Sequence, residues 1–198
     1  MGEFLETIYD VMFKPKDAFQ RFAQTPQVKE ACLVVLITTI LSAVAISAGT
    51  MQIGEYRGGL IAVQLIGNFI TLFVTVAIWH LIAELMSGQG QVKSLLTVVG
   101  FSCFPQLLLV PIYLIASFLA VDMANMLILI ASFAVLIWIM YLIFNGIKIV
   151  YQVSGSKAFL VIIMPMLTML VLMVATFIMI GTMFMSVFDG AIPMPPTL

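Results

Sequence analysis

The feature that most constrains this chain is a series of five apolar stretches, each about long enough to cross a membrane. They cover roughly residues 31–50, 60–85, 95–120, 123–147 and 159–185. Because hydrocarbon offers no hydrogen-bonding partners, a stretch of about 20 such residues can cross a bilayer as a helix. With 63% hydrophobic and 9% charged residues, the chain is too apolar for a water-soluble domain. The sequence therefore predicts an all-α polytopic membrane protein with five transmembrane helices.

The positions of the cations predict which side of the membrane the termini occupy. Five crossings would place on one side Lys14, Lys16, Arg21, Lys29, Lys93, Lys148 and Lys157. The remaining cation, Arg57, falls on the other side. Because Lys and Arg accumulate in cytoplasmic loops, we expect the N-terminus in the cytoplasm and the C-terminus outside. The formal net charge of −1 offers no basic surface for a nucleic-acid partner.

The residues before the first stretch predict a separate amphipathic helical segment. Residues 1–29 carry one apolar and one charged helical face, with a break at Pro15. This segment either lies in the cytoplasmic interface, facing lipid or a protein partner, or packs its apolar face on the helix bundle. The predicted organisation is a cytoplasmic amphipathic segment at 1–29, a five-helix domain at 30–185 and an extracytoplasmic tail at 186–198.

Polar side chains within the second stretch form two groups on different helical faces. Such side chains are functional candidates because they are costly when they face lipid. One face carries a stripe that would suit a transport pathway, made of Gln64, Asn68, Thr71 and Thr75. His80 and Glu84 lie together on nearly the opposite face, four residues apart. Polar groups on two sides predict a central position for this helix in the bundle.

A polar cluster is expected where the second and fourth stretches approach the cytoplasm. Asn145 and Lys148 of the fourth stretch would join His80 and Glu84 there. In a functional interpretation, Glu84 accepts a hydrogen bond from Lys148 and His80 titrates nearby, forming a gate, a proton-coupled site or a headgroup pocket. In a structural interpretation, the same residues only tie two helices together.

Other sequence features argue against catalysis and against a bound metal or cofactor. The sequence lacks hydrolase, nucleotide-binding and metalloprotease motifs, and His80 has no second histidine with which to hold zinc. Pro105 and Pro111 remove backbone donors from the third stretch and predict a helix kink there. Small residues between Ser42 and Gly49 predict close helix packing, either within the chain or against a second copy in a homo-oligomer.

Several short motifs together resemble the Ypt-interacting-protein (Yip) family of five-span membrane proteins. The matching residues, in chain order, are Phe13, Pro15 and Phe19; His80 with Gly88-Gln89-Gly90; Gly100 to Pro105; Gly146; and Ser154, Lys157 and Ala158. The resemblance implies an N-in, C-out bundle of five helices. Eukaryotic members act in vesicle trafficking and contact Rab GTPases, generally through a longer N-terminal region. This compact chain is more similar to prokaryotic members, which implies location in a plasma membrane.

Two functions from different classes are consistent with these patterns. The first is a non-catalytic membrane organiser or adaptor that uses its amphipathic N-terminal helix as a lipid or partner surface. The second is a small transporter, channel or lipid-moving protein with a pathway along the polar stripe of the second transmembrane helix. Access of water to that stripe discriminates between them.

Overall fold

The computed structural model describes residues 2–49 and 57–189, and the regular elements within these ranges are all helical. In chain order they are α1 (Gly2–Phe13), α2 (Pro15–Gln24), α3 (Val28–Gly49), α4 (Arg57–Leu85), α5 (Val92–Ser102), the 3-10 helix η1 (Phe104–Leu108), α6 (Leu109–Ala116), α7 (Val121–Val150) and α8 (Gly155–Asp189). The chain divides into two compact units, Met1–Val161 and Ile162–Leu198. The described part of the second unit is the greater part of α8.

Five helical segments of the described chain are long and apolar enough to cross a membrane. They are Val28–Ala45, Ile61–Leu85, Val92–Ala116, Val121–Val150 and Gly155–Ile180. Each corresponds to one apolar stretch of the sequence, so the prediction of an all-α protein with five membrane-spanning helices is confirmed. The third segment is assembled from α5, η1 and α6.

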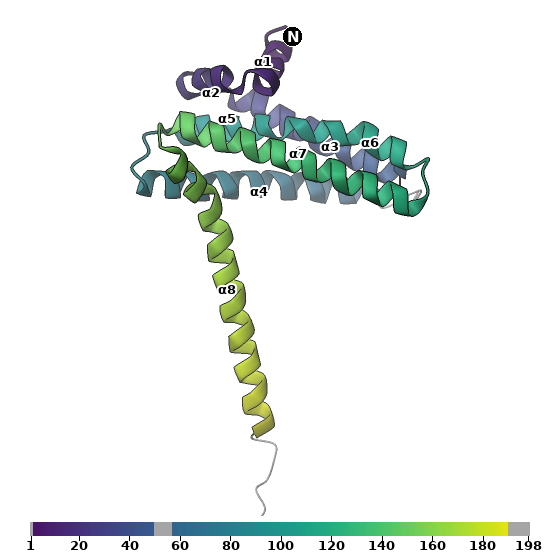
Figure 1. Ribbon diagram of the computed structural model, residues 1–198, viewed down its shortest axis with the longest axis vertical. Helices are drawn as coiled ribbons and strands as arrows, with labels where there is room; N and C mark the ends of the chain where they lie inside the picture. The colour runs from purple at the N-terminus through teal and green to yellow at the C-terminus, as the bar shows by residue number, and fades with distance from the viewer. Residues whose placement is uncertain (1, 50–56, 190–198) are drawn as a thin grey trace, which may run out of the picture. The chain divides into compact units, whose positions relative to one another are not determined.

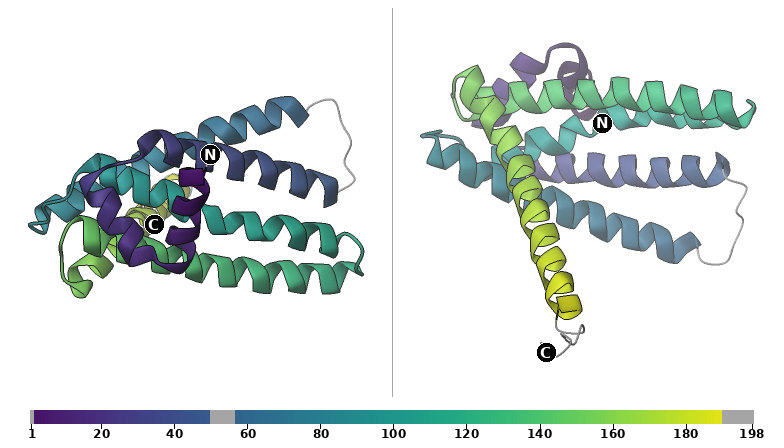
Figure 2. Two further views of the ribbon diagram at one scale, coloured as in Figure 1. Left: turned by 90° about the horizontal axis from the view of Figure 1, so that it is seen from above. Right: turned by 60° about the horizontal axis from the view of Figure 1, so that its bottom comes forward.

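In the first unit the long helices lie side by side, and α1 and α2 cover one end of them (Figure 1 and Figure 2). α5 and α6 both pack against α3 and α7, while α4 packs against α3 and α5. α2 packs on α7 and α5. The turn between α4 and α5 meets the turn between α7 and α8, where the Gln89 N–H donates to the Tyr151 carbonyl at 3.3 Å. Lys93 and Lys157, in the first turns of the helices that follow these two connections, thus lie at the same end of the first unit.

The buried core is concentrated at the end that carries α1 and α2. Phe19 and Phe22 of α2 are at most 1% exposed, and Phe22 stacks on Phe101 of α5 with ring centroids 5.0 Å apart. On α7, Val135 is the one buried residue that precedes Leu142; its other early residues are exposed or half-buried. The first two thirds of α7 therefore present the apolar surface that suits lipid, and the last third belongs to a protein core.

Two glycines allow the helices of this core to approach closely. A Cβ atom added at Gly146 of α7 would lie 2.1 Å from Cγ1 of Val98 on α5. A Cβ atom added at Gly100 of α5 would lie 2.8 Å from Cβ of Ala31 on α3. Real Cβ atoms do not come this close, so these crossings require residues without a side chain. Both glycines belong to the motifs that resemble the Yip family.

The third span changes from α-helix to 3-10 helix around Pro105. Pro105 has no N–H to continue the α-helical pattern. Just before it, the Cys103 N–H donates to the Gly100 carbonyl, three residues back, at 3.2 Å, as in a 3-10 turn. Pro111 lies in the first turn of α6, where a helix tolerates a missing donor. The two prolines thus accompany a change of helix type in this span.

The N-terminal segment folds as two helices separated at Lys14. Pro15 occupies the first turn of α2, where its fixed backbone favours helix initiation. Arg21 of α2 forms an ion pair with Asp10 of α1 and so joins the two helices. The sequence left two arrangements open for this segment. The structure contains one of them, because the apolar face of α2 packs on the bundle. Placement in the membrane interface stays a prediction.

Within the first unit α4 is a peripheral helix. Among its described side chains, the buried ones form a single stripe, namely Leu72, Val76, Trp79 and Ala83. The prediction that polar groups on two sides would make this helix central is therefore wrong for this unit. The physical reason is that the other faces of α4 are mostly apolar, so lipid can cover them without help from further helices.

Candidate functional site

Three polar side chains meet at the end of α4 and form what we term the histidine cluster, defined as His80, Glu84 and Tyr151. His80 Nδ1 lies 2.6 Å from the Tyr151 hydroxyl oxygen, and His80 Nε2 lies 3.3 Å from Glu84 Oε1. Burial, and then the Glu84 carboxylate, raise the pKa of Tyr151 above its ordinary value, so its hydroxyl keeps the proton. The geometry fits a chain in which Tyr151 donates to Nδ1 and Nε2–H donates to Glu84.

The glycine connector after α4 positions Tyr151 in this cluster. A Cβ atom added at Gly88 would lie 2.9 Å from the Tyr151 ring carbon Cδ1, and one added at Gly90 would lie 2.6 Å from it. The ring is 1% exposed and fills the space that side chains at these positions would occupy. On the other side of the contact, Gln152 adopts a left-handed backbone conformation with φ 53° that turns the chain toward α8. Local backbone geometry therefore brings α4 and the end of α7 together.

The structure brings together two of the four residues expected in a polar cluster. His80 and Glu84 are in contact, as their spacing predicts. Asn145 is buried, but its side-chain amide donates to the Tyr141 carbonyl of its own helix at 2.7 Å. Lys148 is exposed and forms no ion pair with any residue that the structure describes. A different cation reaches the turn after α4: Lys157 Nζ donates to the Met86 carbonyl at 2.9 Å.

Tyr151 is the member of the histidine cluster that the sequence analysis did not single out. It lies 71 residues from His80 and outside the polar stripes. One sequence signal could have identified it: an aromatic residue with a polar tip stands where an apolar span ends, a position that often needs a buried hydrogen-bonding partner. In chemical terms the cluster can orient the imidazole and join the end of α4 to the turn after α7.

Among the described residues, the stripe proposed as a pathway on α4 makes one polar contact to a neighbouring helix. Asn68 Nδ2 donates to Thr39 Oγ1 of α3 at 3.0 Å. Gln64 and Thr71 are exposed in the first unit, and Thr75 is half-buried. The Asn68–Thr39 contact gives this stripe a role in helix pairing. In the described ranges, no group of three or more His, Cys, Asp or Glu residues could hold a metal ion.

A row of large apolar side chains follows the outer side of α1, and we term it the α1 row, defined as Leu5, Tyr9 and Phe13. These side chains are 63%, 55% and 65% exposed, respectively. The rings of Tyr9 and Phe13 lie 4.7 Å apart. Thr7 and Val11 on the inner side of the same helix are buried. α1 is therefore fixed to the bundle by one side and presents an apolar row on the other.

Comparison with known proteins gives one match. The family model of the Yip1 domain matches residues 9–176 of the chain. The matched range contains α2, the histidine cluster and the close crossings at Gly100 and Gly146. No curated protein and no solved structure matches the chain.

Proposed function

The chain belongs to the Yip1-domain family, and on this premise we propose that it is a non-catalytic membrane organiser or adaptor. The five apolar helices make it an integral membrane protein. In the proposal, the α1 row is the surface that binds a protein partner, and α2 holds that surface against the bundle. The proposal further assigns the protein to a prokaryotic plasma membrane, with α1 and α2 on the cytoplasmic side.

The observation that carries the proposal is the fixed exposure of the α1 row. Full burial of a large apolar side chain contributes about 1.5–3 kcal/mol, so three half-exposed ones offer a substantial contact energy to a partner. The row does not need to fold on binding, because the Asp10–Arg21 ion pair and the buried rings of α2 already hold α1 in place. A pre-organised surface loses little conformational entropy on association.

The charge pattern supports the cytoplasmic placement. Lys14 and Lys16 lie at the junction of α1 and α2, Lys29 lies in the first turn of α3, and Lys93 and Lys157 lie close to the turns that meet at the same end. The positive-inside bias favours this end for the cytoplasm. The buried, protonated hydroxyl of Tyr151 supports a structural role for the histidine cluster, in keeping with a protein that catalyses no reaction.

Site-specific photocrosslinking tests the proposal in native membranes. A photoreactive amino acid placed at Tyr9 of the full chain should give a discrete protein adduct, and the same group at Ile130, on the exposed part of α7, should not. Leu5→Ser should weaken the Tyr9 adduct without unfolding the protein, because Leu5 is exposed. Point variants are preferable to deletion of the N-terminal helices, since Phe19 and Phe22 belong to the core.

Two results would count against an adaptor. The first is a Tyr9 probe that gives no protein adduct in membranes. The second is full reaction of Gln64→Cys and Thr71→Cys with a membrane-impermeant thiol reagent, since continuous water along the α4 stripe would support a transport pathway. The adaptor account expects these two positions to be protected in the membrane.

A further inference from the structure

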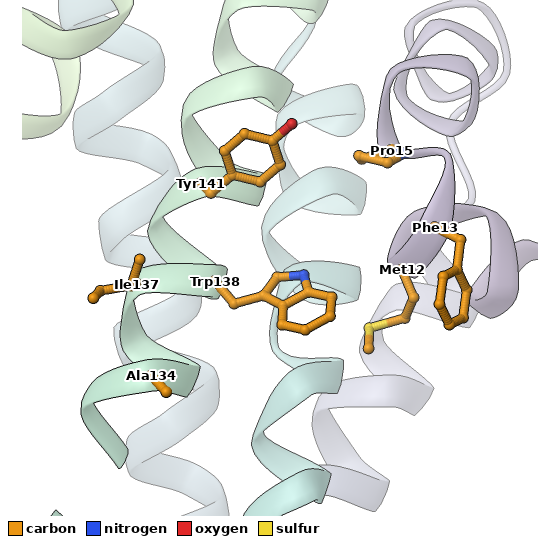
Figure 3. Close-up of a pocket in the computed structure, with 7 residues that line it drawn as sticks. All are labelled: Met12, Phe13, Pro15, Ala134, Ile137, Trp138 and Tyr141. Carbon is orange, nitrogen blue, oxygen red and sulfur yellow. The ribbon is translucent and has the colours of Figure 1, made fainter. Parts of the chain in front are cut away.

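A groove of about 440 Å³ lies between the α1–α2 junction and α7. Figure 3 shows its two walls: Met12, Phe13 and Pro15 face Trp138 and Tyr141 across it. The lining side chains are apolar except for the indole N–H of Trp138 and the hydroxyl of Tyr141. An apolar groove with polar groups only at the tips of its aromatic residues suits an amphipathic ligand.

The length of α7 places this groove at the edge of the hydrocarbon layer. α7 has 30 residues, whereas about 20 suffice to cross hydrocarbon. Counted from Val121, about 20 residues end close to Tyr141, which is also where the side chains of α7 change from exposed to buried. Trp and Tyr residues accumulate at the boundary between hydrocarbon and headgroups. Trp138 and Tyr141 therefore mark that boundary, and lipid molecules have direct access to the groove.

The headgroup side of the groove is positively charged. Lys14 and Lys16 are the chain neighbours of the lining residue Pro15, and both are exposed. Neither lysine forms an ion pair within the part of the chain that the structure describes. Asp10 is neutralised by its pairing with Arg21, so Asp17 is left as the acidic residue nearest to the junction. The junction thus keeps a net positive charge that complements a phosphate group.

We propose that this groove binds an anionic glycerophospholipid of the surrounding bilayer. One acyl chain lies against Trp138 and Pro15, and the phosphate is held by Lys14 and Lys16. The site goes beyond the adaptor function, because it requires no protein partner. Phe13 belongs to both the groove and the α1 row, so substitutions at other residues are needed to test the groove alone.

Quenching of Trp138 fluorescence by brominated lipids tests the site. Trp79→Phe leaves Trp138 as the sole tryptophan of the chain, which contains two. The full chain is reconstituted in phosphatidylcholine bilayers that contain increasing fractions of either brominated phosphatidylglycerol or brominated phosphatidylcholine. The anionic lipid should quench at the lower fraction, with a preference of about fivefold for each lysine near the headgroup. Native mass spectrometry of the unsubstituted protein should show the same selectivity.

Matched variants separate the site from general contact with lipid. Combining Lys14→Gln with Lys16→Gln should remove the preference, while Lys29→Gln, an exposed lysine outside the groove, should retain it. Ala134→Phe, which adds a ring to the α7 wall, should lower quenching by both lipids. Crosslinking from Tyr9 should be unaffected by the lysine variants, so the site and the adaptor function can fail independently.

Three outcomes would overturn the lipid site. Equal quenching by the two lipids at every fraction would show that Trp138 meets ordinary boundary lipid. A preference that survives the paired lysine substitutions would place the anionic lipid elsewhere. Absence of quenching by either lipid would show that a protein segment covers the groove.

Discussion

Replacing Gly146 by alanine probes the closest helix contact in the core. The new Cβ atom would lie 2.1 Å from Val98 Cγ1, 3.2 Å from Val98 Cβ and 3.3 Å from Val98 Cγ2. Rotating the valine moves one methyl group away but leaves its Cβ atom too close, and valine has one strongly preferred rotamer in a helix. The substitution should therefore force α5 and α7 apart or strain the side chain.

The expected cost is a balance of two opposing terms. Overpacking of a buried site typically costs about 1–3 kcal/mol. Alanine is favoured over glycine in a helix interior by about 1 kcal/mol, which offsets part of that cost. We therefore expect Gly146→Ala to lower the free energy of unfolding by up to about 2 kcal/mol. Gly67→Ala on α4 is the matched control, because its Cβ atom meets nothing within 4 Å and should leave stability unchanged or raised.

A double-mutant cycle identifies the contact responsible. In a Val98→Ala background the clashing methyl groups are absent, so adding Gly146→Ala should be neutral or stabilising, with a coupling energy equal to the overpacking cost of about 1–3 kcal/mol. Stability can be measured by SDS-induced unfolding in mixed micelles, followed by tryptophan fluorescence. The reasoning fails if Gly146→Ala is as stable as Gly67→Ala, or if Val98→Ala does not rescue it.

Two further predictions concern polar groups and use the same unfolding assay. Tyr151→Phe removes the hydroxyl that donates to His80 Nδ1 and should lower the free energy of unfolding by about 1–2 kcal/mol, since this nitrogen loses its partner. Glu84→Gln, at a half-exposed site, should change the free energy of unfolding by less than about 0.5 kcal/mol. Equal effects of the two would contradict the arrangement of the histidine cluster. Ser94 has a buried hydroxyl with no hydrogen-bond partner among the residues that the structure describes, whereas the buried Ser102 hydroxyl donates to a carbonyl of its own helix at 2.7 Å. Ser102→Ala should therefore be about 1 kcal/mol less stable than Ser94→Ala, and the reverse order would refute this assignment.

The membrane-spanning helices could be predicted from sequence because each depends on a local property. A long apolar run must satisfy its backbone within its own segment, so hydropathy alone locates it. The contact of His80 with Glu84 was predictable for a similar reason, since residues four apart on a helix are neighbours. The break before α2 follows from Pro15, whose missing N–H is best tolerated at a helix start.

The remaining features depend on contacts between distant segments. Tyr151 reaches His80 only because Gly88 and Gly90 leave room for its ring, and no periodic pattern signals that fit. Lys148, the expected partner of Glu84, illustrates the same difficulty. Its helical face was predictable from the sequence, but the contact that Lys157 makes with the Met86 carbonyl instead was not. The peripheral place of α4 was missed because a polar stripe indicates contact with protein, water or one neighbouring helix equally well.

The lipid groove was likewise hidden in the sequence. Its two walls come from Pro15 and Trp138, which are far apart in the chain and carry no shared motif. The docking of α2 on α7 is what turns the face of α7 that carries Trp138 into one wall of a groove.

The central claim is that this chain crosses the membrane five times, with its N-terminal helices in the cytoplasm. It is tested most directly by labelling single cysteines in intact cells, after Cys32 and Cys103 have been replaced by alanine. Gln20→Cys on α2 is an exposed reporter position, and Asp189→Cys at the end of α8 reports on the predicted extracytoplasmic end. The account predicts that an impermeant thiol reagent labels position 189 in intact cells and position 20 only after permeabilisation. Labelling of both positions from the same side would contradict it.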